Sequence, residues 1–193
     1  MRRILASKSP RRRELLKYVT NDFEVISSDV EEIMDDTLSL EDQAANLAYI
    51  KAKAVFDTTN EDRIVIGSDT MVVKDGLIYG KPKTEEDAKQ MLKALTKGNA
   101  KHSVLTGLCI LISQNGKIKE YKFCDTVFVY LKEMADEEID KWINTGKAMD
   151  KAGAYGIQDE FSVFVNKIEG NYNSVVGLPV HILYDVIKEY LEK

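Results

Sequence analysis

The dipeptide Asn115-Gly116 separates two long stretches rich in apolar and β-branched residues, 103–113 and 117–130. Asn-Gly is the preferred pair for a two-residue β-turn with positive φ angles, so these stretches are expected to form one long antiparallel hairpin. A shorter hairpin is expected around Asp75-Gly76, between strands at 71–73 and 77–79. The fold must therefore accommodate a sheet with antiparallel pairs.

Helices are expected between these strands, because helix-start signals such as Ser9-Pro10 precede amphipathic stretches. The expected helices are 9–17, 40–56, 84–95, 136–144 and 179–191, and further short strands are expected at 4–7, 23–27, 63–66 and 161–168. Hairpins mixed with crossovers predict an α/β fold with a mixed, extended β-sheet. With 193 residues and neither a repeat nor a linker, the chain is expected to be one domain over 1–193.

Charge and composition limit the class of partner. The net charge of −5 argues against a general nucleic-acid surface and makes a small anion the expected partner. No apolar run approaches about 18 residues, so no membrane span is expected. Cys109 and Cys124 lack metal-ligand spacing, which indicates reduced thiols in a cytoplasmic protein.

The segment Ser7-Lys8-Ser9-Pro10-Arg11-Arg12 follows a short apolar run and predicts an anion-binding site. Ser9 is a hydroxyl N-cap, and Pro10 suits the first helical position. Arg11, Arg12 and Arg13 then occupy the first turn, where cations are disfavoured by roughly 0.3–1 kcal/mol each. A bound anion such as phosphate would offset that cost, whereas the alternative is a solvated basic helix end.

Two charged residues are placed in apolar surroundings. Lys51 completes the apolar stripe of the expected helix 40–56, so it either extends to the surface or binds phosphate in a cleft. Asp69 is expected at the end of the strand 63–66, before another apolar run. It is either held by an Asx turn or kept for function, as a metal ligand or a general base for water.

Three loops add candidates. Glu32 lies in the acidic run 29–36, which is either a solvated loop or a source of oxygen ligands for Mg²⁺ or Mn²⁺. Lys81 precedes Pro82 on a restrained turn. Residues 150–158 combine small residues with a lysine and a glutamine, which suits close approach to a ligand.

The sequence argues against kinase-like and dinucleotide-dependent chemistry and against a histidine metal site. The chain has neither a GxxxxGK[ST] phosphate-binding loop nor a GxGxxG dinucleotide-binding motif. His102 and His181 have no nearby metal-ligand partner in the sequence and are expected to be structural.

Taken in order, several blocks resemble the Maf proteins, a family of nucleoside triphosphate pyrophosphatases once described as septum formation inhibitors. The blocks are Leu5 to Arg12, Leu47-Ala48 with Lys51-Ala52, Gly67-Ser68-Asp69-Thr70, Lys81-Pro82, His102-Ser103-Val104 with Thr106-Gly107, Asp150 to Gln158, Gly170-Asn171-Tyr172, and Val175 to Pro179. Their order and spacing, rather than any single block, carry the resemblance over nearly the whole chain.

The resemblance implies an elongated α/β fold similar to that of inosine triphosphatases, with two lobes around a cleft. It also implies hydrolysis of a nucleoside triphosphate to the monophosphate and pyrophosphate, a divalent cation (Mg²⁺ or Mn²⁺) and a homodimer. The form of residues 150–158 resembles the branch that acts on dTTP and UTP. Lys151 and Gln158 are therefore the candidates for substrate discrimination.

In the mechanism that follows from the resemblance, Asp69 orients and deprotonates the attacking water. Glu32 and Asp69 hold the metal. The phosphates are bound by Ser7, Arg11, Arg12, Lys51, Thr70 and Lys81.

Two alternatives stay open. One is a non-catalytic nucleotide-binding regulator of cell division or septum formation, and the other is a pyrophosphatase for a purine or 7-methylguanine nucleotide. Modified pyrimidine nucleotides fall within the expectation for dTTP and UTP. Asp159-Glu160 follow Gln158 where the family usually continues with glycine, which leaves the exact base preference open.

Overall fold

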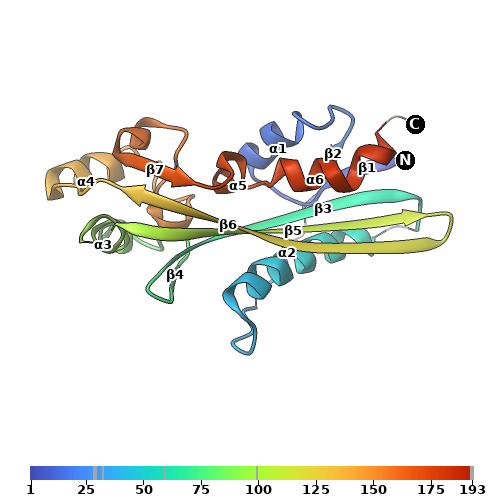
Figure 1. The fold of residues 1–193 in the computed structure, drawn as a ribbon, viewed down its shortest axis with the longest axis horizontal. Helices are drawn as coiled ribbons and strands as arrows, with labels where there is room; N and C mark the ends of the chain where they lie inside the picture. Colours follow the sequence, from blue (N-terminus) through green and yellow to red (C-terminus); the bar gives the residue numbers. More distant parts are fainter. Residues whose placement is uncertain (28–29, 32, 59, 99, 192–193) are drawn as a thin grey trace. The chain divides into compact units, whose positions relative to one another are not determined.

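The computed structural model describes residues 1–193 except 28, 29, 32, 59, 99, 192 and 193. Its strands are β1 (Arg2–Leu5), β2 (Glu24–Val25), β3 (Arg63–Lys74), β4 (Leu77–Tyr79), β5 (Lys101–Gln114), β6 (Lys117–Leu131) and β7 (Val165–Glu169). Its helices are α1 (Pro10–Leu16), α2 (Leu40–Phe56), α3 (Glu85–Thr96), α4 (Asp136–Ile143), α5 (Tyr172–Val176) and α6 (Val180–Ile187), with short 3₁₀ helices η1 (Ala152–Ala154), η2 (Glu160–Phe164) and η3 (Lys188–Tyr190). The predicted mixed α/β fold is confirmed (Figure 1).

The described strands form one seven-stranded mixed sheet in the order β2-β1-β3-β5-β6-β7, and β4 pairs with β3. β1 is parallel to β2 and β3, whereas the β3–β4 and β6–β7 pairs are antiparallel. Both predicted hairpin turns are confirmed, because Asp75-Gly76 has φ angles of 52° and 77° and Asn115-Gly116 has φ angles of 52° and 74°.

The chain divides into two compact units. Unit 1 comprises residues 1–69, 106–125 and 177–193, and unit 2 comprises residues 70–105 and 126–176. None of the helices in the described part of the chain is long and apolar enough to cross a membrane.

The core of unit 1 lies between α2 and the strands that it covers. Ala48, Ala52 and Val55 of α2 pack with Ile4 of β1 and with further buried residues, namely Ala6, Phe56, Val65, Cys109 and Leu111. The alternate strand residues Leu5, Ile64, Ile66, Leu108 and Ile110 are also fully buried, so both faces of these strands are covered. Figure 1 shows α2 on one side of them and α1 and α6 on the other.

Glycines allow α2 to approach the sheet closely. A Cβ added at Gly107 would lie 1.9 Å from the carbonyl oxygen of Ala44, and one at Gly67 would lie 2.3 Å from that of Ala48. The backbone of α2 therefore rests directly on β3 and β5.

Unit 2 contains an aromatic core. Phe161 is fully buried, and its ring centroid lies 5.0 Å from that of Tyr155 and 5.3 Å from that of Trp142. Such tilted pairs add about 0.5–1.5 kcal/mol each beyond the area that they bury. Tyr155 belongs to the loop 150–158, so this core anchors that loop.

The structure differs from the sequence-based expectations in several places, of which three concern the sheet or add a helix. The predicted strands 63–66 and 71–73 are one continuous strand, β3. The predicted strand 161–168 begins as the 3₁₀ helix η2 and becomes β7 only at Val165. Helix α5 was not expected, and its five residues are too few for a helical periodicity to be recognised.

Candidate functional site

The segment that follows β1 has the predicted helix-start geometry. The Oγ atom of Ser9 accepts a hydrogen bond from the backbone N–H of Arg12 at 3.4 Å, and Pro10 is the first residue of α1. Ser7 is buried, and its Oγ accepts from the backbone N–H of Ser9 at 3.2 Å. The two hydroxyls thus fix how the chain passes from strand to helix.

Arg12 is held by contacts at two of its nitrogens. Its Nε donates to the carbonyl oxygen of Gly177 at 2.9 Å, and its Nη1 donates to Ser7 Oγ at 3.3 Å. Ser7 Oγ is the acceptor in its bonds from the Ser9 N–H and from Arg12 Nη1. The hydroxyl proton of Ser7 can therefore still be donated to an anion. Arg11 lies beside Arg12 in the first turn and is half-buried.

Lys51 and Asp69 form an ion pair in unit 1. Lys51 Nζ lies 2.5 Å from Asp69 Oδ1, and the side chains are only 17% and 11% exposed. Lys51 therefore lies on the sheet-facing side of α2, and its charge meets a carboxylate. Of the alternatives for Lys51, the structure excludes simple extension to the surface.

The expectation for the position of Asp69 was wrong in one respect. Asp69 lies inside the continuous strand β3 rather than at a strand end, and its side chain bonds Lys51 rather than forming an Asx turn. β1 pairs with β3 only as far as Leu5 and Ile66, so β1 does not cover the edge of β3 from Gly67 to Asp69.

The other predicted site residues that the structure describes belong to unit 2. Thr70 is half-buried in β3, Lys81 and Gln158 are exposed, and Lys151 is buried. The site residues thus fall into a group in unit 1 (Ser7, Arg11, Arg12, Lys51 and Asp69) and a group in unit 2 (Thr70, Lys81, Lys151 and Gln158).

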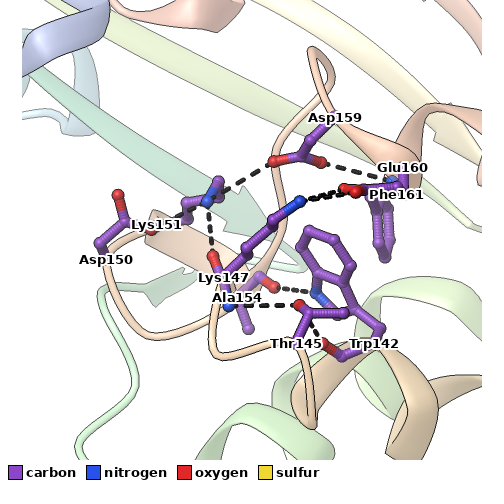
Figure 2. A network of polar contacts seen from close by, with 9 residues as sticks. All are labelled: Trp142, Thr145, Lys147, Asp150, Lys151, Ala154, Asp159, Glu160 and Phe161. Atoms are coloured by element: carbon purple, nitrogen blue, oxygen red, sulfur yellow. Dashed lines mark hydrogen bonds and ion pairs between the residues drawn. The ribbon is translucent and has the colours of Figure 1, made fainter.

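Lys151 is held within its own loop (Figure 2). Its Nζ lies 2.8 Å from Asp150 Oδ1 and 3.6 Å from Asp159 Oδ2, and it donates to the carbonyl oxygen of Lys147 at 2.5 Å. The ammonium group is also 5.9 Å from the ring centre of Trp142. Its charge is therefore balanced locally by two carboxylates.

Comparison with known protein families matches residues 2–190 to the family described as Maf-like protein. This chain belongs to the Maf-like family. It is similar to a dTTP/UTP pyrophosphatase of Alkaliphilus metalliredigens (strain QYMF), with 45% identity over 98% of this chain and 96% of the relative. It is also similar to a dTTP/UTP pyrophosphatase of Geobacillus sp. (strain WCH70), with 48% identity over 92% of this chain and 91% of the relative.

The fold of this Maf-like chain is shared with a solved structure of low sequence identity. The Staphylococcus aureus Ham1 protein superposes with a TM-score of 0.51 over 98% of this chain and 100% of that protein, at 16% identity. At that identity the likeness concerns the fold alone.

The structure gives a local reason for the two acidic residues that depart from the Maf pattern after Gln158. Asp159 accepts from the backbone N–H of Phe161 at 3.3 Å and so caps η2, in addition to its contact with Lys151. Glu160 pairs with Lys147 at 2.6 Å (Figure 2). Asp159 thus holds Lys151 directly, and Glu160 holds Lys147, whose carbonyl oxygen accepts from Lys151.

Sequence reasoning missed the contacts that anchor this loop in the Maf-like chain. Trp142 Nε1 donates to the carbonyl oxygen of Ala154 at 2.8 Å, and Tyr155 lies 2.6 Å from His102 Nε2. His102 Nδ1 faces the carbonyl of Ala100 at 3.3 Å, which only accepts, so Nε2 must accept from the Tyr155 hydroxyl. The expectation that His102 is structural is confirmed, and no signal in the sequence named its partner.

Burial explains the protonation state of this pair. It lowers the pKa of His102 to about 4 and raises the pKa of the Tyr155 hydroxyl. Both groups are therefore neutral at pH 7, as the hydrogen bond between them requires.

The predicted metal ligand Glu32 lies outside the described residues. Among those that are described, no group of three or more His, Cys, Asp or Glu side chains is arranged to hold a metal ion. Mg²⁺ is commonly bound by one or two carboxylates together with substrate phosphates, and Asp69 offers one such carboxylate.

Proposed function

We propose that this Maf-like protein hydrolyses dTTP and UTP to the nucleoside monophosphate and pyrophosphate. The observation that carries the proposal is the nearly buried Lys51–Asp69 pair at 2.5 Å, in the same unit as Arg12 and the hydroxyl of Ser7. Relatives that are dTTP/UTP pyrophosphatases and align over almost the full chain support the choice of reaction and base.

The reaction needs a base, cations and a positioned water. Water attacks the α-phosphorus, the bond from that phosphorus to the oxygen bridging to the β-phosphorus breaks, and pyrophosphate leaves. Asp69 accepts the proton of the attacking water, a role worth about 10²–10⁴ in rate. Lys51 holds the carboxylate in place and carries positive charge close to the phosphates.

The phosphates are bound by the residues around the β1–α1 connection. The guanidinium of Arg12 supplies a planar, charged donor, and Ser7 donates its hydroxyl proton. We assign Arg11, Thr70 and Lys81 to further phosphate contacts, and Lys151 and Gln158 to the selection of the pyrimidine base.

We assign a Mg²⁺ or Mn²⁺ ion to Asp69 and Glu32, together with oxygens of the substrate. When bound, the ion neutralises phosphate charge and lowers the pKa of a coordinated water. Glu32→Gln is expected to shift the Mn²⁺ activation curve to higher concentration, and an unchanged curve would remove Glu32 from the metal site.

We also place the reaction in the cytoplasm. Cys109 is a buried thiol and Cys124 a half-buried one, which suits a reducing compartment.

The proposal is tested with dTTP, UTP, CTP, ATP, GTP and 7-methyl-GTP in Mg²⁺ and in Mn²⁺, with pyrophosphate separated from orthophosphate. Pyrophosphate released chiefly from dTTP and UTP is the expected result. Tight nucleotide binding without hydrolysis would contradict it and favour the non-catalytic regulator, while release chiefly from another nucleotide would overturn the base assignment.

Asp69→Asn tests the base directly. The variant is expected to lose about 10²–10⁴ in kcat. Asp57→Asn is the matched control. Asp57 also pairs with a lysine of α2, Lys53, but that ion pair is exposed. Near wild-type turnover by Asp69→Asn would exclude Asp69 as the base.

A further inference from the structure

The hydroxyl of Ser68 is completely buried and makes contacts that the proposed reaction does not yet use. Its Oγ lies 2.8 Å from the carbonyl oxygen of Gly107 and 2.9 Å from that of Gly177. Both partners only accept, so Ser68 must be the donor in each contact.

A hydroxyl has one proton, so Ser68 can satisfy only one of the two carbonyls at a time. The carbonyl of Gly177 is also the acceptor for Nε of Arg12, at 2.9 Å. Gly177 has φ of 130°, a backbone conformation that residues with side chains rarely adopt. Ser68 and Arg12 therefore meet at one carbonyl whose direction depends on an unusual backbone conformation.

The position of Ser68 in β3 explains why it reaches this carbonyl. Successive side chains of a strand point to opposite faces, and Asp69 points to the face covered by α2, where it meets Lys51. Ser68 points to the other face, toward Gly177 and Arg12. The dipeptide Ser68-Asp69 thus contacts Lys51 on one face of the sheet and the carbonyl that binds Arg12 on the other.

We propose that Ser68 is a positioning residue that orients the guanidinium of Arg12 for the substrate phosphates, by fixing the carbonyl of Gly177 that both side chains share. This inference rests on the proposed function, in which Arg12 binds phosphate. Ser68 itself touches neither the substrate nor the reacting atoms. Without its hydroxyl, the Gly177 carbonyl loses a donor and the guanidinium loses a fixed acceptor.

A double-mutant cycle separates this role from a merely structural one. We compare kcat and KM for UTP in the wild type, Ser68→Ala, Arg12→Ala and the double variant. Ser68→Ala is expected to lower kcat/KM about tenfold, mainly through KM, because a contact made equally in ground and transition states affects binding. In the Arg12→Ala background the same change is expected to cost less than threefold.

The control for removing a buried hydroxyl is Ser113→Ala in β5 of the same unit. It is expected to keep kcat/KM within twofold of the wild type. Urea unfolding of each variant, compared with the wild type, verifies that the folded state is populated under the assay conditions.

The outcomes distinguish this inference from the proposed function. A wild-type protein without pyrophosphate release, or an Arg12→Ala variant with unchanged KM, would overturn the proposed function or its phosphate site. A different result would overturn only the role of Ser68. In that result the wild type is active, Arg12→Ala raises KM, and Ser68→Ala lowers kcat/KM by the same factor in the wild-type and Arg12→Ala backgrounds.

Discussion

Gly67 is a position at which one added methyl group is expected to disturb both stability and the site. A Cβ there would lie 2.3 Å from the carbonyl oxygen of Ala48, whereas ordinary contact begins at 3.4 Å. Helix α2 would have to retreat from β3 by about 1 Å, the difference between these distances. Because the closest atom belongs to the backbone, no side-chain rotation can relieve the contact.

Gly67→Ala is therefore expected to lower the free energy of unfolding by about 1–3 kcal/mol, the range for overpacked cores. The displaced helix carries Lys51, so its ammonium group moves relative to Asp69. A misplacement of about 1 Å can cost about 100-fold in rate, and we expect kcat/KM for UTP to fall by up to that factor.

Urea unfolding and UTP hydrolysis measure the two effects. Gly80→Ala is the control for stability, since a Cβ at Gly80 would meet nothing within 4 Å. If Gly67→Ala unfolded within about 0.5 kcal/mol of the wild type, the close contact between α2 and β3 would be refuted. A stability loss with unchanged hydrolysis would refute the link between helix position and the Lys51–Asp69 pair.

Two further predictions follow from buried titratable groups. Burial lowers the pKa of His102 from 6.5 to about 4, so the contribution of neutral His102 to stability is complete above pH 6.5 and is lost as the pH falls toward 4. Between pH 7.5 and 5 the free energy of unfolding, measured in urea, should change by about 2 kcal/mol. His102→Gln, whose amide oxygen can still accept from Tyr155, should lose that part of the pH dependence. An equal dependence in both proteins would exclude His102 as its source. Burial likewise raises the pKa of the Cys109 thiol to about 12, so iodoacetamide at pH 8 should alkylate half-buried Cys124 well before Cys109, and equal rates in the folded protein would contradict the burial of Cys109.

Local signals in the sequence were sufficient for much of the fold. The hairpin at Asn115-Gly116 depends on two residues that tolerate positive φ, and the helix start at Ser9-Pro10 depends on a cap that bonds three residues along the chain. Such features are decided within a few residues. The continuity of β3 was missed because Gly67, where α2 packs closely, and the polar residues after it interrupt the apolar pattern of the sequence. The strand itself continues through them.

The contacts of the candidate site could be predicted only in part. The spacing in α2 indicated that Lys51 lies on or beside a buried face, but its partner is 18 residues away and on another element. The shared carbonyl of Gly177 is farther still from Ser68 and Arg12 in sequence. Every residue has a backbone carbonyl, so the sequence does not mark this one as an acceptor. Chemistry that depends on side-chain type was therefore recognisable, whereas the groups that orient those side chains were not.

The two residues assigned to base selection differ in what a substrate must displace to reach them. Lys151 is buried, and its ammonium group already contacts Asp150, Asp159 and the carbonyl of Lys147. A base that bonds Lys151 must therefore compete with existing partners, and the longest of these contacts, 3.6 Å to Asp159, is the weakest competitor. Gln158 is exposed and can turn its amide toward a pyrimidine edge without breaking that network. We therefore expect direct reading of the base to fall more readily to Gln158, while Asp159 holds Lys151 and the start of η2 in place.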